Sequence, residues 1–209
     1  MIPELGQLAL AFALMVSLVL GVLGLAGPQC RIPLWSRMAR PLALTGFVLM
    51  MAAFTCLAIS FVVNDFSVTY VAQHSNTQLP LQYRFGAVWG GHEGSLLLWV
   101  VILSAWTAAV AIFSRSLPIE MVARVLGVLG FIAFGFILFI LLTSNPFDRL
   151  MPAVMEGRDL NPLLQDPGLV YHPPMLYMGY VGFSVAFAFS IAALLAGQLD
   201  AAWARWSRP

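Results

Sequence analysis

The sequence has 209 residues and a net charge of +1, and 61% of its residues are hydrophobic while only 9% are charged. Soluble domains carry roughly 25% charged residues, so a water-soluble fold could not bury this much apolar surface. The sequence also lacks a basic stripe that could neutralise phosphates, which argues against nucleic acid as a partner. The composition therefore predicts an all-α, polytopic integral membrane protein in contact with the lipid bilayer.

Five apolar stretches, none of which contains a charged residue, are long enough to cross a bilayer. About twenty apolar residues span the hydrocarbon core as an α-helix, and stretches of this length are too long for barrel strands. No basic residues precede the first stretch, so we expect a retained helix and not a cleaved signal peptide. The predicted transmembrane helices cover approximately residues 5–26, 42–63, 94–113, 125–143 and 173–196.

The arginine distribution predicts a periplasmic N-terminus and a cytoplasmic C-terminus, because basic residues concentrate in cytoplasmic segments. In this orientation the outer segments hold only Arg84, Arg149 and Arg158. The inner segments hold the other arginines, which are Arg31, Arg37, Arg40, Arg115, Arg124, Arg205 and Arg208. At the inner face, Trp203 and Trp206 are expected to act as an interfacial anchor.

Two long periplasmic loops are expected, at about residues 64–93 and 144–172. Loops of this length are usually functional or disordered. The second loop is rich in proline and leads into Pro173 and Pro174, which favours a fixed, irregular path. The predicted functional face is therefore periplasmic.

The first candidate cluster is the Trp-Gly-Gly-His-Glu-Gly motif at residues 89–94, where the first long loop enters the third helix. Trp89, His92 and Glu93 could contact a ligand or cofactor, because ionisable residues at a membrane edge are costly unless they are used. The alternative is a helix entry with an aromatic belt, in which Glu93 interacts with the helix dipole. His92 and Glu93 are adjacent, so they do not form a metal-binding pair on one helix face.

The second cluster is the Tyr-His-Pro-Pro motif at residues 171–174. Prolines are favoured in the first turn of a helix, so we expect a helix to start at Pro173, with His172 at its mouth. Histidine is a common axial ligand of haem iron, and nearby aromatic and methionine side chains could surround a flat ligand. These side chains are Tyr171, Met175, Tyr177 and Tyr180. The alternative is an interfacial histidine among tyrosines, and His74 is expected to be an ordinary loop residue.

Motifs of common catalytic and metal sites are absent from the sequence, including GxSxG, HExxH and the P-loop. The sequence contains neither CxxC nor CxxCH, so the chain itself does not carry covalently attached c-type haem. The composition and motifs alone therefore identify no reaction.

At the two clusters the sequence resembles the CcmF/NrfE/CcsA haem lyase family of bacterial cytochrome c maturation. Residues 89–99, residues 161–182 and the Met-Ile-Pro-Glu-Leu-Gly start carry this resemblance, which extends over the whole chain. The family is much longer, so the resemblance implies that residues 1–209 are the N-terminal membrane portion of such a protein. The second outward histidine and the ligands of a resident haem would then lie beyond Pro209.

The resemblance implies that the chain belongs to a holocytochrome c synthase in the bacterial inner membrane, although this portion alone is not expected to be catalytic. Haem b would arrive from the haem chaperone CcmE and be attached to apocytochrome c with the help of the thiol-handling protein CcmH. His172 would be an axial ligand to the haem iron, with Tyr171, Tyr177, Trp89, His92 and Glu93 at the cofactor. The alternatives are an NrfE-type protein for nitrite reductase maturation, a transporter segment, or a scaffold that does not bind haem.

Overall fold

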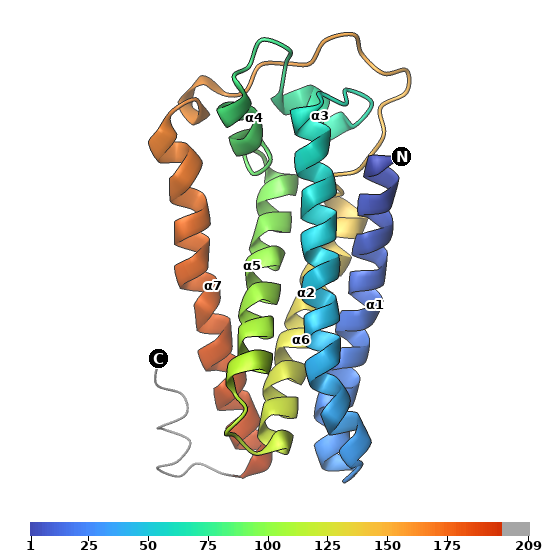
Figure 1. Ribbon diagram of the computed structural model, residues 1–209, viewed down its shortest axis with the longest axis vertical. Helices are drawn as coiled ribbons and strands as arrows, with labels where there is room; N and C mark the ends of the chain where they lie inside the picture. Colours follow the sequence, from blue (N-terminus) through green and yellow to red (C-terminus); the bar gives the residue numbers. More distant parts are fainter. Residues whose placement is uncertain (198–209) are drawn as a thin grey trace.

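The computed structural model describes residues 1–197 as a bundle of five long helices that is covered at one end by shorter elements (Figure 1). The long helices are α1 (Ile2–Gln29), α2 (Pro33–Val62), α5 (His92–Phe113), α6 (Ile119–Thr143) and α7 (Pro167–Ala196). Each contains a stretch that is long and apolar enough to cross a membrane. The predicted all-α architecture with five spans is therefore confirmed, whereas the predicted anchor at Trp203 and Trp206 lies outside the described residues.

All five long helices begin earlier in the chain than predicted, and three of them begin six or more residues earlier. α2 begins at Pro33 where position 42 was expected, α6 begins at Ile119 where 125 was expected, and α7 begins at Pro167 where 173 was expected. Hydropathy identifies the part of a helix that crosses the hydrocarbon core, but helices continue into the polar interface until a capping residue or proline ends them. α1 and α2 accordingly have proline in their first turns.

The start of α7 changes the interpretation of the Tyr-His-Pro-Pro motif. Asp166 is the N-cap of α7, and its carboxylate accepts a hydrogen bond of 2.8 Å from the backbone N–H of Gly168. Pro167 then occupies the first helical turn, where a proline is tolerated best. The prediction that Pro173 starts the helix is therefore wrong. Pro173 and Pro174 lie inside α7, and His172 lies within the helix and not at its mouth.

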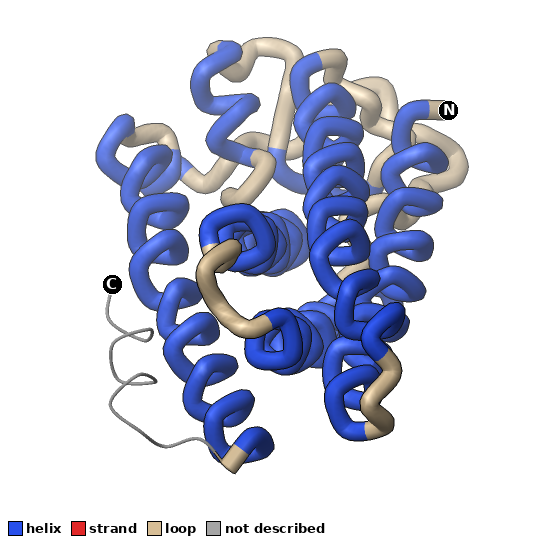
Figure 2. The backbone as a smooth tube through the Cα atoms, turned by 60° about the horizontal axis from the view of Figure 1, so that its bottom comes forward, coloured by secondary structure: helices blue, strands red, loops and turns tan. Residues whose placement is uncertain are grey.

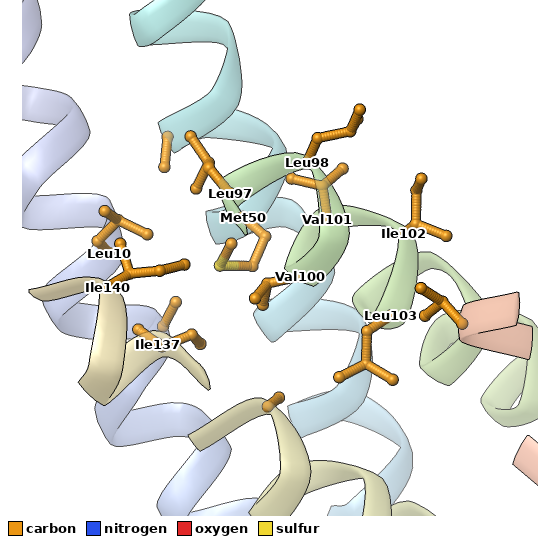
Figure 3. Close-up of a cluster of buried hydrophobic side chains, with 14 of the residues drawn as sticks. Leu10, Met50, Leu97, Leu98, Val100, Val101, Ile102, Leu103, Ile137 and Ile140 are labelled. Atoms are coloured by element: carbon orange, nitrogen blue, oxygen red, sulfur yellow. The ribbon is translucent and has the colours of Figure 1, made fainter. Parts of the chain in front are cut away.

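The bundle is arranged with α5 and α6 between the α1–α2 pair and α7 (Figure 2). In the membrane-spanning part, 61% of α5 is buried, compared with 28% of α7, so α5 is central and α7 is peripheral. Buried side chains from four helices converge in the middle of the bundle (Figure 3). They include Leu10 of α1, Met50 of α2, Val100 of α5 and Ile137 of α6.

Helices α1 and α6 pack closely through glycines. A Cβ atom at Gly24 would lie 2.6 Å from the carbonyl oxygen of Ala123 and 2.7 Å from the Cα atom of Gly127. Close backbone approach at small residues is how membrane helices gain packing energy where the hydrophobic effect between them is weak. The glycines therefore fix the position of α6, which also packs against α5 and α7.

The elements that cover the bundle form a cap at the end where the N-terminus lies (Figure 1). The cap contains α3 (Thr69–His74), α4 (Leu81–Ala87) and residues 144–166, which include a 3₁₀ turn at Pro162–Leu164. The predicted loop 64–93 thus contains two short helices, and the predicted loop 144–172 ends where α7 begins. Backbone hydrogen bonds fix residues 144–166 across the cap, including one of 2.7 Å from the N–H of Arg158 to the carbonyl of Ala72.

At the opposite end of the bundle, Arg40 stabilises the end of α5. Its guanidinium donates hydrogen bonds to the carbonyl oxygens of Ala111 (3.0 Å) and Ser114 (2.8 Å). A cation at a helix C-terminus interacts favourably with the helix dipole and satisfies carbonyls that lack helical partners. This end also carries other arginines of the predicted inner segments, which are Arg31, Arg37, Arg115 and Arg124.

Candidate functional site

The segment between α4 and α5, which carries the Trp-Gly-Gly motif, is held by Tyr70 of α3. The Tyr70 hydroxyl accepts a hydrogen bond of 2.9 Å from the backbone N–H of Gly91 and donates one of 3.1 Å to the carbonyl of Val88. Only 3% of Tyr70 is exposed, and burial raises the pKa of its phenol. The hydroxyl therefore remains protonated and available as a donor at physiological pH.

Two glycines of this motif allow the cap to approach the segment closely. A Cβ atom at Gly94 would lie 1.7 Å from the carbonyl oxygen of Val88, and one at Gly91 would lie 2.6 Å from Nε2 of His74. His74 itself lies in α3, where its Nδ1 is 3.0 Å from the carbonyl oxygen of Tyr70. His74 is therefore not the ordinary loop residue that was expected, because it packs beneath the motif.

His92 and Glu93 begin α5, for which Gly91 is the N-cap. Glu93 lies in the first turn, where a negative charge interacts favourably with the helix dipole, as the helix-entry interpretation expects. The Nδ1 atom of His92 is 3.2 Å from the hydroxyl oxygen of Ser144, which connects α5 to the residue that follows α6. Among residues 1–197, no group of three or more His, Cys, Asp or Glu side chains could hold a metal ion.

Helices α5 and α7 and the segment before α5 line an open pocket of about 360 Å³ near the cap. Its aromatic walls come from both predicted clusters, which lie far apart in the sequence. Ser95 and Tyr177 join the two helices through their hydroxyl groups, whose oxygen atoms are 2.6 Å apart. The residues that line the pocket are Trp89, Gly90, Gly91, His92, Ser95, Leu96, Trp99, Tyr177 and Tyr180.

His172 lies outside this pocket, on an exposed part of α7 near the cap. Tyr171, which is 70% exposed, lines a second pocket of about 260 Å³ together with Tyr83, Phe85 and Trp89. Met175 is 75% exposed and lines neither of these pockets. Tyr171 and Met175 therefore lie outside the pocket that Tyr177 and Tyr180 line, because α7 is helical throughout the motif and turns these side chains to different faces. That all four surround one ligand remains a prediction.

Trp89 connects the two pockets, because its side chain lines both of them. Its indole Nε1 donates a hydrogen bond of 3.1 Å to the carbonyl oxygen of Val170 in α7. The sequence indicates Trp89 as a candidate site residue but does not reveal this contact, since Trp89 and Val170 are separated by 81 positions.

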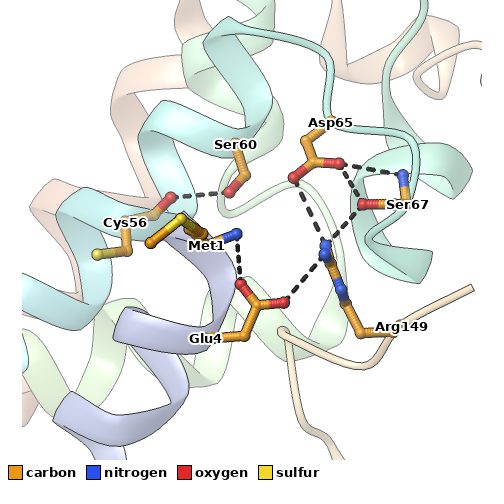
Figure 4. Close-up of polar contacts among 7 residues, drawn as sticks. All are labelled: Met1, Glu4, Cys56, Ser60, Asp65, Ser67 and Arg149. Carbon is orange, nitrogen blue, oxygen red and sulfur yellow. Dashed lines mark hydrogen bonds and ion pairs between the residues drawn. The ribbon is translucent and has the colours of Figure 1, made fainter.

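A polar network that sequence analysis missed joins α1 to the cap (Figure 4). The guanidinium of Arg149 lies 3.0 Å from the Glu4 carboxylate and 3.5 Å from that of Asp65. Arg149 also donates a hydrogen bond of 2.6 Å to the Ser67 hydroxyl, and the α-ammonium group of Met1 lies 2.6 Å from Glu4. These residues come from three separate segments, so no local pattern in the sequence could have revealed the network.

Comparison with known protein families shows to which family this chain belongs. The family described as "Cytochrome C assembly protein" matches residues 89–209, which is more than half of the chain. The chain belongs to the cytochrome c assembly protein family. The matched region begins at Trp89, so it contains the α5–α7 pocket and His172.

Relatives named as cytochrome c-type biogenesis proteins match all or nearly all of the chain. The cytochrome c-type biogenesis protein CcmF of Pseudomonas aeruginosa is 62% identical over 100% of this chain, and CcmF of Escherichia coli is 57% identical. NrfE of Haemophilus influenzae is 48% identical over 95% of this chain. The chain spans only about a third (32%) of the length of the CcmF relatives.

A solved structure shows the same fold. The structure named Cytochrome c Heme Lyase CcmF aligns with a TM-score of 0.85 and 29% sequence identity. The alignment covers 99% of this chain and 33% of the solved chain. The bundle and cap described above are therefore the fold of this part of a cytochrome c assembly protein.

Proposed function

We propose that this chain takes part in cytochrome c maturation by handling haem at the cap end of the bundle. Family membership supports the process, and the relatives named cytochrome c-type biogenesis protein and cytochrome c heme lyase support haem as the cargo. The observation that carries the proposal is the position of His172, which is exposed in α7 close to the cap.

The His172 imidazole has the chemistry of a haem ligand. Within residues 1–197 the imidazole makes no hydrogen bond, so a ring nitrogen is free to bind iron. The adjacent Tyr171 ring offers a flat surface beside that iron. The α5–α7 pocket, with Tyr177, Trp89 and His92, provides an aromatic recess on the neighbouring face, and Glu93 follows His92 in the first turn of α5.

We place this surface at the periplasmic face of the bacterial inner membrane, because most arginines of residues 1–197 lie at the opposite end of the bundle. In this arrangement haem b passes from the haem chaperone CcmE to His172. Apocytochrome c and the thiol-handling protein CcmH approach from the same side. The acidic side chains of the cap, including Asp148, Asp159 and Asp166, are exposed to such partners.

The proposal is tested by the His172→Ala variant in the complete natural protein, with Leu176→Ala as the matched control. Leu176 is exposed on the same helix about one turn further along the chain. We expect the yield of holocytochrome c to fall at least tenfold for His172→Ala and to remain unchanged for Leu176→Ala, at equal protein levels. An unchanged yield for His172→Ala would contradict the ligand role and favour a scaffold that docks partners through the cap.

The higher identity to CcmF (62%) than to NrfE (48%) favours general cytochrome c maturation over a role restricted to nitrite reductase. Complementation of a strain that lacks its own CcmF distinguishes the two, with an ordinary CxxCH cytochrome as the reporter. Restored maturation of that reporter supports the CcmF-type function, and its absence at normal protein levels favours the NrfE type.

A further inference from the structure

The Pro173–Pro174 pair weakens α7 at the turn that carries His172. Each residue in a helix interior normally donates its backbone N–H to the carbonyl four positions earlier, and proline has no N–H to donate. The carbonyl groups of residues 169 and 170 therefore lack their usual helical donors. The turn from Pro167 to His172 is joined to the rest of α7 by fewer hydrogen bonds than an ordinary helical turn.

Trp89 supplies a donor for one of these two carbonyl groups. Its indole Nε1 donates to the Val170 carbonyl oxygen at 3.1 Å, in place of the N–H that Pro174 lacks. The side chain of Val170 also packs on Gly86 of α4, where a Cβ atom would lie 3.0 Å from Val170 Cγ2. The side chain of Val170 is thus held by α4, and its carbonyl is held by the segment that connects α4 to α5.

We infer that Trp89, besides lining the α5–α7 pocket, is a positioning residue for His172 and acts on it through the backbone of α7. This inference rests on the proposed role of His172 as the haem ligand. His172 is two residues beyond Val170 in the same helix, so the hydrogen bond from Trp89 sets the orientation of the turn that presents the imidazole. Without that bond, the turn is free to move about the Pro173–Pro174 pair.

A second tryptophan contact to α7 serves as a control, because no proline lies four positions after the carbonyl group that it reaches. Trp106 of α5 donates from its indole Nε1 to the carbonyl oxygen of Met178 in α7, also at 3.1 Å. The residue four positions after Met178 is Gly182, which has an N–H to donate, so this carbonyl does not depend on Trp106. The Trp106→Phe variant therefore removes the same kind of bond from the same helix without freeing a weakened turn.

The experiment compares Trp89→Phe, Trp106→Phe and His172→Ala in the complete natural protein loaded with haem. The readouts are the haem dissociation constant and the axial-ligand signature in absorption and resonance Raman spectra. We expect Trp89→Phe to weaken haem binding about fivefold, the effect of losing one net hydrogen bond, and to broaden the histidine-ligand signature. Trp106→Phe should leave both readouts unchanged.

A rescue variant separates positioning from a general loss of packing. Pro174→Ala restores a backbone N–H for the Val170 carbonyl, so Pro174→Ala combined with Trp89→Phe should recover the haem affinity and the spectrum. If Trp89→Phe does not accumulate, 3-benzothienylalanine at position 89 replaces only the N–H group with sulfur and keeps the ring shape. A Trp89 variant that is restored by Pro174→Ala supports the inference.

Three results would overturn the inference, and each can be distinguished from the others. If His172→Ala abolishes the histidine signature while Trp89→Phe behaves like Trp106→Phe, haem binding by His172 stands and the positioning role fails. If His172→Ala leaves the signature unchanged, the proposed function fails and the positioning role fails with it. Loss of affinity in Trp89→Phe without rescue by Pro174→Ala would also contradict positioning through the Val170 carbonyl.

Discussion

The hydroxyl group of Tyr70 accepts a hydrogen bond from the backbone N–H of Gly91 at 2.9 Å, which joins the first cap helix to the start of α5. The same hydroxyl donates to the Val88 carbonyl at 3.1 Å, so one buried group satisfies both sides of the Trp89 segment. A buried backbone donor or acceptor without a partner is costly. Tyr70 therefore fixes the backbone from which the side chains of Trp89 and His92 extend into the pocket.

We predict that Tyr70→Phe destabilises the protein by about 1–3 kcal/mol, because it leaves the Gly91 N–H and the Val88 carbonyl buried without this partner. The measurement is thermal unfolding of the purified protein in detergent. Tyr83→Phe is the control, since Tyr83 is only partly buried and its hydroxyl makes no hydrogen bond within residues 1–197. Equal melting temperatures for the two variants would show that the hydroxyl of Tyr70 contributes nothing specific.

Gly94 and Gly135 should respond in opposite ways to the same substitution. A Cβ atom at Gly94 would lie 1.7 Å from the Val88 carbonyl oxygen, whereas one at Gly135 of α6 would have no atom within 4 Å. We expect Gly94→Ala to lower the melting temperature strongly and to reduce holocytochrome c yield, because the backbone must move. Gly135→Ala should be neutral or stabilising by up to about 1 kcal/mol, since alanine is the better helix former. Tolerance of Gly94→Ala would contradict the close packing of the cap on α5.

The contact between Glu156 and Thr77 should depend on pH. The side-chain hydroxyl and the backbone N–H of Thr77 donate to the Glu156 carboxylate at 2.7 and 2.9 Å, and these bonds hold the pKa of Glu156 below its usual value of 4.5. A lowered pKa in the folded state means that the contact is complete above pH 4.5 and is lost as the pH falls through the lower folded value.

A nitroxide label at the exposed Met155 position measures this effect through its mobility, in a background without Cys30 and Cys56. We expect mobility to rise as the pH is lowered below 4.5. The Glu156→Gln variant, which cannot ionise, should show mobility that does not change with pH. The same pH dependence in Glu156→Gln would assign the transition to another group.

The orientation of the bundle can be tested by labelling introduced cysteines in intact cells. Gln78 is exposed in the cap, and Ser116 is exposed in the connection between α5 and α6 at the opposite end. In a background without Cys30 and Cys56, we expect a membrane-impermeant maleimide to label Gln78→Cys in intact cells and Ser116→Cys only after permeabilisation. The reverse pattern would place the cap in the cytoplasm and would exclude the proposed periplasmic haem surface.

The boundaries of α7 show where sequence reasoning was sufficient and where it failed. The apolar stretch after His172 correctly indicated a membrane span, but two signals competed for its start. Pro173 and Pro174 match a first turn, while the preceding Asp166 and Pro167 supply both a capping carboxylate and a proline at the first position. The structure uses the earlier start, since the cost of the internal prolines is offset by outside contacts such as the hydrogen bond from Trp89.

The sequence by itself determined the five membrane spans, because the length and apolarity of a segment are sufficient for a helix to cross a bilayer. It also identified the two clusters around His92 and His172. Only the tertiary structure decided that these clusters meet, with Ser95 bonded to Tyr177 and Trp89 bonded to Val170. Contacts over more than 80 positions depend on which helices pack side by side, and that choice is made by packing across the whole bundle and not by any local pattern.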